Sequence, residues 1–115
     1  MDKFILPEYE DYTFMDYLFR KTTGFAYEIY VTMDDGVNKT PYILCQKEDP
    51  LFSDAIVVSI SSSPCVLMGE FANTEEQKEI FDFVTENKDT LIEYWNKELG
   101  SFDFFDKVLI RGIHI

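Results

Sequence analysis

The stretch from Thr74 to Gly100, TEEQKEIFDFVTENKDTLIEYWNKELG, constrains the fold most, because it has the pattern of one long amphipathic helix. At about 100° per residue, its large apolar side chains gather on one side and a row of carboxylates lies on the other. Thr74 with Gln77 fits a capping box, and Gly100 fits the residue that follows a helix C-terminus. The apolar side consists of Ile80, Phe81, Val84, Leu91, Ile92, Trp95 and Leu99.

Four segments before this helix have the pattern of β-strands, namely Ala26–Met33, Tyr42–Gln46, Asp54–Ser61 and Cys65–Phe71. The first alternates apolar with polar residues, and the third is apolar on both faces, as in a central strand covered by helices. Turn sequences such as Asp34-Asp35-Gly36 separate the segments. Because the connections are short, we expect an antiparallel meander.

Two short helices are expected to flank these elements. One spans about Asp11 to Lys21, where apolar residues recur at i, i+1, i+4 and i+5 from Phe14 onward. The other follows Ser101 as N-cap and runs from Phe102 to about Lys107, before a tail, LIRGIHI, that fits a closing strand. The sequence therefore predicts a single α+β domain over residues 1–115: a four-stranded antiparallel meander packed by one long C-terminal helix, with a short N-terminal and a short C-terminal helix.

The charge balance excludes some classes of partner. Asp and Glu number 22 against 10 Lys and Arg, giving a formal net charge of −12. Nucleic acid and anionic lipid would repel such a chain, whereas a basic protein or a cationic ligand would be attracted, and solubility alone is the simplest use of the charge. No stretch approaches the ~20 apolar residues of a membrane span, and the apolar run in MDKFILPEYEDY is too short for a secretory signal. We expect a cytoplasmic protein.

Motifs for catalysis, metals or cofactors are not found. The single histidine, His114, gives no usual catalytic triad, and the two cysteines form no CxxC zinc motif. Cys45 and Cys65 each fall within a predicted strand, so we expect buried free thiols; a disulfide would require those strands to be neighbours. Glycine-rich phosphate loops are absent, and the Asp34-Asp35-Gly36 turn lacks the ligand spacing of a calcium loop. We expect a non-enzyme with no metal and no cofactor.

The row of carboxylates on the long helix is the sharpest charge pattern. Its members, spaced by 4, 3, 4, 3 and 4 residues, are Glu75, Glu79, Asp82, Glu86, Asp89 and Glu93. On one straight helix they would form a line roughly 27 Å long, at ~1.5 Å per residue. Like charges at i and i+4 repel, so two interpretations stay open: a solvated face, or a surface for a basic partner.

The aromatic residues have a similar double interpretation, since they exceed what one small core needs. Tyr94 and Phe104 lie off the main apolar stripes and are expected to form an exposed patch, hence a homodimer or partner contact. Tyr30, Tyr42 and Trp95 are expected near a possible ligand pocket between the sheet and the long helix.

Several of these residues also carry a resemblance. The Thr23-Gly24 turn before YEIYV and PYILCQ, and the later run NKDTLIEYWNKELGSFDFFDKV, are similar to a family of small uncharacterised bacterial and prophage proteins. The resemblance spans Lys21 to Val108, and its most specific part is Asn87, Leu91, Tyr94, Trp95 and Asn96, followed by residues 102–105. It implies a bacterial or phage origin in mobile elements and a role in phage–host or toxin–inhibitor conflict; it supplies no catalytic residues.

Three hypotheses follow for the function. In the first, the chain is a small, acidic, non-catalytic interaction protein that masks a basic nuclease, defence protein or toxin through the carboxylate row. In the second, it is a small-ligand-binding protein or an unrecognised enzyme with a pocket between sheet and helix. In the third, it is a structural homodimer whose acidity keeps it soluble.

Overall fold

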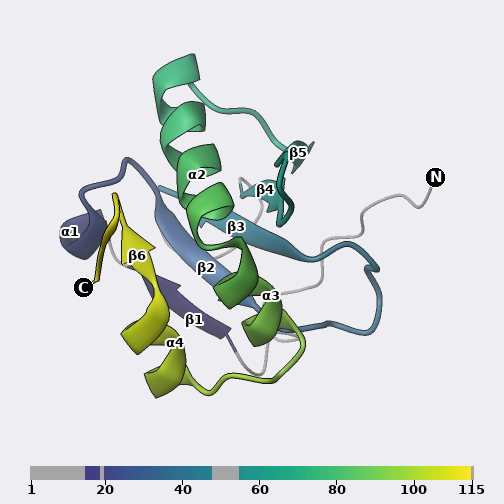
Figure 1. Ribbon diagram of the computed structural model, residues 1–115. Coiled ribbons are helices and arrows are strands. Elements are labelled where there is room, and N and C mark those ends of the chain that lie inside the picture. The colour runs from purple at the N-terminus through teal and green to yellow at the C-terminus, as the bar shows by residue number, and fades with distance from the viewer. Residues whose placement is uncertain (1–14, 19, 48–54, 115) are drawn as a thin grey trace.

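The computed structural model describes residues 15–18, 20–47 and 55–114, and its central feature is a five-stranded antiparallel sheet. The strands pair in chain order, as in a meander (Figure 1). They are β1 (Met15–Leu18), β2 (Glu28–Thr32), β3 (Tyr42–Gln46), β4 (Ile56–Ser59) and β5 (Val66–Met68). The α+β class and the antiparallel sheet are thus confirmed, with one strand more than predicted.

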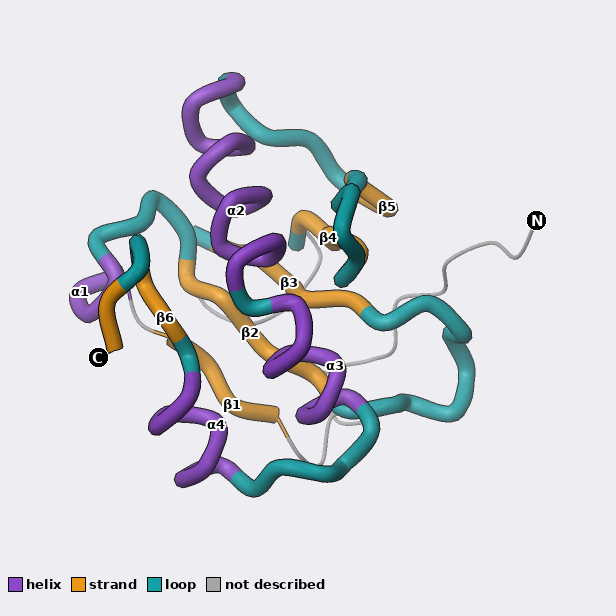
Figure 2. The backbone as a smooth tube through the Cα atoms, in the orientation of Figure 1, coloured by secondary structure: helices purple, strands orange, loops and turns teal. Residues whose placement is uncertain are grey.

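Helices gather on one side of this sheet. Two of them, α2 (Thr74–Glu86) and α3 (Lys88–Trp95), lie across one face of it, and the short α4 (Ser101–Lys107) packs beside α3 (Figures 1 and 2). A single-turn helix, α1 (Arg20–Thr23), precedes β2. The chain then closes with a separate two-stranded hairpin, β6 (Leu109–Ile110) and β7 (Ile113–His114), in place of a single closing strand.

The helix predicted over residues 11–21 is wrong for residues 15–18, and of its described part only Arg20 and Lys21 are helical. Residues 15–18 form β1, paired with β2 from Met15↔Thr32 to Leu18↔Ile29, and only the residues after 19 turn into a helix. The alternation of a strand explains the side chains, since Leu18 enters the core while Tyr17 stacks on Tyr30 at a ring distance of 5.3 Å. Pairing with a distant strand has overridden a local helical pattern. Residues 11–14 of that prediction lie outside the described residues.

The predicted long helix is two helices, because the chain breaks at Asn87. The Asn87 side chain is 2% exposed and makes three hydrogen bonds. Its Nδ2 donates to the carbonyls of Phe83 (3.0 Å) and Leu109 (2.7 Å), and its Oδ1 accepts from the Leu109 N–H at 2.7 Å. One side chain therefore ends α2 and fastens β6 to the junction between α2 and α3.

The helix caps differ from those predicted by one or a few residues. Asn73, rather than Thr74, is the N-cap of α2, and its Oδ1 accepts from the Glu76 N–H at 2.9 Å. Asparagine is among the best N-cap residues, so it takes this position one residue earlier. Since α3 already ends at Trp95, Gly100 serves as the N-cap of α4, the position predicted for Ser101.

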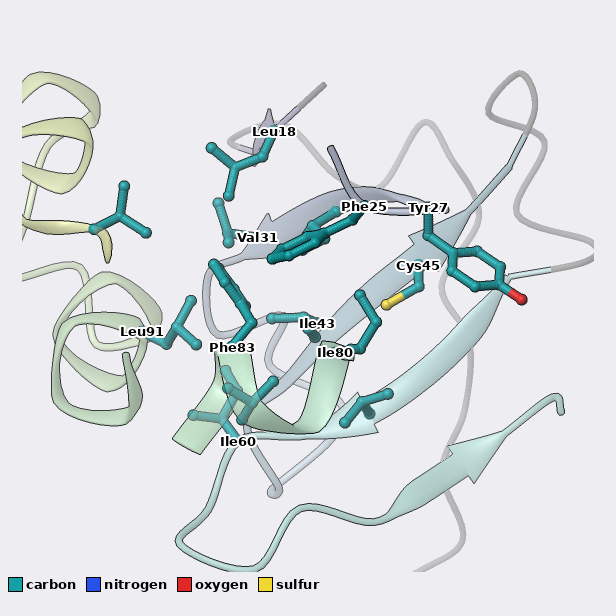
Figure 3. Close-up of a cluster of buried hydrophobic side chains, with 14 of the residues drawn as sticks. Leu18, Phe25, Tyr27, Val31, Ile43, Cys45, Ile60, Ile80, Phe83 and Leu91 are labelled. Atoms are coloured by element: carbon teal, nitrogen blue, oxygen red, sulfur yellow. The ribbon is translucent and has the colours of Figure 1, made fainter. Parts of the chain in front are cut away.

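The main core lies between the sheet and the helices (Figure 3). Alternate residues of β2, β3 and β4 point toward the helices, among them Ile29, Val31, Ile43, Cys45, Ile56 and Val58. The helices contribute Ile80, Phe83, Val84, Leu91, Tyr94 and Phe104. The opposite face of the sheet is also buried, in a smaller cluster of Tyr30, Tyr42, Leu44, Ala55, Val57 and Trp95. Internal strands that are apolar on both faces fit this arrangement.

The two cysteines differ in environment. Cys45 lies in β3 and is fully buried, as predicted, and burial raises the pKa of its thiol. Cys65 was expected to be buried within a strand but is exposed, because it precedes β5 at the edge of the sheet. Both thiols are free, and the Cys65 Sγ lies 3.4 Å from the Ser59 Oγ.

Candidate functional site

The break at Asn87 divides the predicted row of carboxylates between two helices. Glu75, Glu79, Asp82 and Glu86 lie on one side of α2, over a length of roughly 16 Å at ~1.5 Å per residue. Asp89 and Glu93 belong to α3, beyond the break. The six carboxylates are therefore not on one uninterrupted helix, and the four on α2 are the ones that line a common groove.

These four carboxylates line a groove between α2 and the turn of the β6–β7 hairpin. The groove has a volume of about 520 Å³, and its lining residues are Phe25, Glu75, Lys78, Glu79, Asp82, Phe83, Glu86, Arg111 and Gly112. Phe25 and Phe83 are 4% and 2% exposed, so they form the deepest part of it. Their rings meet edge to face at 5.9 Å, which gives the groove an aromatic floor.

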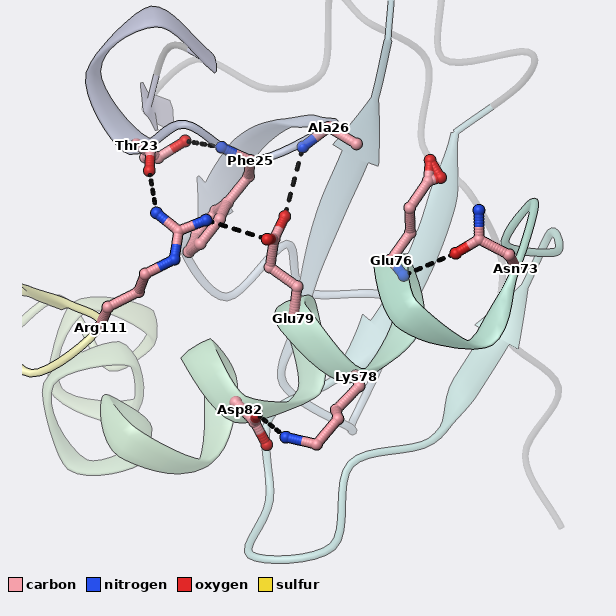
Figure 4. A network of polar contacts seen from close by, with 9 residues as sticks. All are labelled: Thr23, Phe25, Ala26, Asn73, Glu76, Lys78, Glu79, Asp82 and Arg111. Atoms are coloured by element: carbon pink, nitrogen blue, oxygen red, sulfur yellow. Dashed lines mark hydrogen bonds and ion pairs between the residues drawn. The ribbon is translucent and has the colours of Figure 1, made fainter.

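Arg111 forms the wall opposite α2 and is held by three contacts (Figure 4). Its Nη1 donates to the Thr23 carbonyl at 2.7 Å, and its Nη2 pairs with Glu79 Oε2 at 2.9 Å. Its guanidinium carbon lies 4.8 Å from the centre of the Phe25 ring. The other Glu79 oxygen accepts from the Ala26 N–H at 3.3 Å. Arg111 thus ties the hairpin to α2 and to the loop before β2.

Two positive φ angles place Arg111 in this position. Arg111 and Gly112 have φ values of 52° and 80°, as in the type I′ turns that suit two-residue hairpins. Glycine adopts this region freely, whereas a residue with a Cβ is strained there by roughly 1 kcal/mol. Gly24 makes room on the far side, since a Cβ added there would lie 3.3 Å from Arg111 Nη1. The backbone of Arg111 is thus strained at the residue whose guanidinium forms the wall of the groove.

Charges are distributed unevenly along the groove. Glu79 is paired with Arg111, and Asp82 is paired with Lys78 at 2.6 Å. Glu86 and Glu75 are exposed, and neither takes part in an ion pair with another residue of the described chain. Four carboxylates against two cations leave the lining with a formal charge of −2, concentrated at the two ends.

The rest of the predicted row lies outside the groove lining. On α3, Glu93 pairs with Lys107 at 3.4 Å, and Asp89 is exposed. Lys107 comes from α4, so this pair links two helices. Exposed pairs of this kind contribute about 0–1 kcal/mol.

The aromatic residues predicted to form a site are core residues. Tyr94 and Phe104 were expected to be exposed, but they are 1% and 0% exposed and pack at a ring distance of 5.1 Å. Because α3 begins anew after Asn87 and α4 folds against it, these side chains turn inward. The Tyr94 hydroxyl donates to Asp16 Oδ2 at 2.7 Å; burial, together with this bond, raises the pKa of Tyr94. Phe102, at 90% exposed, is the aromatic side chain that faces solvent on α4.

The predicted ligand-pocket residues are also packed. Tyr30, Tyr42 and Trp95 are 5%, 0% and 4% exposed, and the Tyr42 and Trp95 rings meet at 5.2 Å. They belong to the cluster on the sheet face opposite the main core. Their burial gives no support to an open ligand site at this place.

The most specific residues of the family resemblance act in folding. Asn87 fastens the hairpin, Leu91 and Tyr94 are buried, and Trp95 packs on Tyr42. Asn96 is the C-cap of α3 and is exposed. Within the described residues, the roles of this motif are those of packing and hydrogen bonding.

Sequence reasoning missed the second half of the groove. Phe25, Arg111 and Gly112 come from segments far from α2 in the sequence. The Arg-Gly pair between the short segments LI and IHI is a hairpin signal that could have placed the turn, but not its position beside Glu79.

The described residues contain no group of three or more His, Cys, Asp or Glu side chains placed to hold a metal ion. They also contain no helix of the length and apolarity that crossing a bilayer requires. Comparison with known proteins finds no family model, no curated protein and no solved structure that matches the chain.

Proposed function

We propose that this chain is a small, acidic, non-catalytic interaction protein of phage or mobile-element origin that binds and masks a basic protein partner. The partner class is a nuclease, a defence protein or a toxin. The observation that carries the proposal is the groove along α2, where four carboxylates and two cations surround an aromatic floor. The chain as a whole has a formal net charge of −12.

The physical basis is complementarity between a negative groove and a cationic surface. Exposed carboxylates at the rim steer a basic partner and raise its association rate, an effect that salt screens over about 8–10 Å. The aromatic floor offers apolar contact for the methylene stems of lysine and arginine side chains. Binding is therefore expected to be salt-sensitive, with a part of its free energy that salt does not remove.

The groove carboxylates are assigned the main role and those on α3 a minor one. Glu75 and Glu86 form no ion pair within the described chain, so a partner meets them without displacing one. Asp89 is exposed on α3, outside the groove lining, and Glu93 is partly neutralised by Lys107.

Charge reversal with a matched control tests the proposal. The variant Glu75→Lys/Glu86→Lys reverses the two groove ends, and Glu98→Lys/Asp106→Lys makes the same charge change at exposed positions outside the groove lining. Tagged proteins are used to capture partners from lysate of the native host at low and moderate salt, after circular dichroism has confirmed folding.

We expect a basic partner that wild type and the control variant capture and the groove variant loses. A partner captured equally by all three proteins, or no partner for the wild type even at low salt, contradicts the proposal.

A further inference from the structure

We infer that the groove receives an extended segment of the partner in which two basic residues are separated by three positions, with an apolar residue midway between them. This inference rests on the proposed function and specifies the kind of partner surface. It follows from the length of the groove, the order of charges along it and the nature of its floor.

The length of the groove sets the length of the segment. Glu75 and Glu86 lie near its two ends, roughly 16 Å apart along the α2 axis at ~1.5 Å per residue. An extended chain advances ~3.3 Å per residue, so about five residues span this distance. The volume of about 520 Å³ lies within the range of roughly 300–1,000 Å³ usual for ligand sites, which suits a short segment lying between the helix and the hairpin turn.

The order of charges sets where the basic residues lie. Along α2 the groove carries a carboxylate without an ion pair in the described chain at Glu75, two neutralised ones at Glu79 and Asp82, and another without such a pair at Glu86. A matching segment is therefore basic at its ends and uncharged in the middle. Side chains of an extended chain share a face at every second residue, so positions i and i+4 lie ~13 Å apart on one face. Long lysine or arginine side chains cover the remaining distance.

The aromatic floor of the groove determines which kind of residue fits the middle of the segment. Position i+2 of the segment faces the same way as i and i+4, toward the floor made by Phe25 and Phe83. A charged group there would approach the Arg111–Glu79 pair, which already satisfies both partners. An apolar side chain at i+2 meets the aromatic rings without displacing that pair. The recognised pattern is thus basic-x-apolar-x-basic.

Two peptides of the same composition test the spacing. The peptide GKSLSKG has the inferred pattern, and GKKLSSG places the same two lysines side by side. Each is titrated to millimolar concentration into ¹⁵N-labelled protein, and amide chemical shifts give both the affinity and the location. Glu75→Gln and Glu86→Gln are tested singly and together, with Glu98→Gln as the matched control outside the groove lining, and spermidine serves as a small cation.

We expect GKSLSKG to bind more tightly than GKKLSSG and to shift the amides of α2 and Gly112. Each single groove variant should weaken GKSLSKG by roughly two- to five-fold, the range of an exposed ion pair, and the double variant should bind both peptides alike. The Glu98→Gln control should bind as the wild type does.

The failures are distinguishable. Equal binding of the two peptides, or shifts outside the groove, overturns the inference. Tighter binding of spermidine than of GKSLSKG assigns the groove to small cations instead. If neither peptide binds while the lysate partner is still captured and lost on charge reversal, the inference falls and the proposed function stands. If peptides and partner both fail to bind, both fall.

Discussion

Replacing Asn87 with alanine tests whether one side chain holds both the helix junction and the second wall of the groove. The Asn87 side chain is 2% exposed and bonds the carbonyl of Phe83 and both backbone groups of Leu109. Without this side chain both backbone groups of Leu109 lose their partner, while the Phe83 carbonyl keeps its bond from the Asn87 backbone N–H. Alanine at this position removes all three bonds and leaves a small cavity.

The magnitude follows from those bonds. Leaving a buried donor or acceptor unpaired costs about 1–3 kcal/mol, and two such groups belong to Leu109 alone. The Phe83 carbonyl keeps its hydrogen bond from the Asn87 backbone N–H, so losing the side-chain bond to this carbonyl costs less free energy. Alanine returns up to ~0.7 kcal/mol through its better helix propensity. We therefore expect the free energy of unfolding to fall by about 2–4 kcal/mol.

The matched control is Asn96→Ala. Asn96 belongs to the same sequence motif and is the C-cap of α3, but it is exposed and its cap bonds come from its backbone N–H. We expect it to change stability by less than ~0.5 kcal/mol, as surface substitutions usually do.

Urea unfolding followed by circular dichroism measures both variants, and amide hydrogen exchange at Leu109 reports the hairpin directly. Asn87→Ala should lower the urea midpoint and speed exchange at Leu109 beyond the change in global stability. The reasoning is refuted if Asn87→Ala lies within 0.5 kcal/mol (a margin of about the size of a surface effect) of the Asn96→Ala control, or if exchange at Leu109 is unchanged.

The remaining predictions concern Arg111 and Asp35. Arg111→Gly removes the ion pair with Glu79 and also the strain of the left-handed backbone conformation, so the free energy of unfolding, measured by thermal unfolding, should change by only about 0–1 kcal/mol. Arg111→Ala also removes the ion pair but keeps the strain, so it should be less stable than Arg111→Gly. Equal stabilities of the two variants would contradict the assignment of strain. Burial alone would raise the pKa of Asp35, but hydrogen bonds from Asn38, Val37 and Tyr42 outweigh it and lower that pKa below 3.8. This carboxylate therefore contributes stability above pH 3.8 that is lost as pH falls through its lower folded pKa. The test compares urea unfolding at pH 7 and pH 3, about one unit or more either side of the usual carboxyl pKa. Between these values the urea midpoint of wild type should fall more than that of Asp35→Asn. An equal fall in both proteins would contradict the stabilising role of the ionised Asp35.

Local sequence patterns predicted the strands and turns whose contacting residues are close together in the chain. Alternation in β2 and double-sided apolarity in β4 identified strands, and the turn at Asp34-Asp35-Gly36 is closed by Asp35, whose Oδ1 accepts from the Val37 and Asn38 N–H groups. The short connections led to the meander. These features depend on residues within one hairpin, which a single sequence displays directly.

The missed features depend on residues far apart in the chain. Residues 15–18 fit a helix locally and became β1 only through pairing with β2. Nothing around Asn87 forbids a continuous helix, and the break is set by Leu109, 22 residues away. The inward turn of Tyr94 follows from that break and from Asp16, 78 residues away. The spacing of residues along the sequence does not reveal contacts between such distant positions.

The same limit applies to the candidate site. The carboxylates of α2 could be predicted, because the helical period places them on one side. Their neutralisation at Glu79 could not, because Arg111 comes from a hairpin 32 residues further on. The predicted surface was a uniform row of charge, and the structure makes it a groove with a neutral centre.

The order of the elements has a consequence for folding. Glu79 belongs to α2, whereas its partner Arg111 lies in a hairpin turn 32 residues further along the chain. The Lys78–Asp82 pair forms within α2 itself, but Glu79 is neutralised only when the hairpin has folded back against the helix. A partner that requires a neutral centre in the groove would therefore discriminate the folded molecule from one whose hairpin is open.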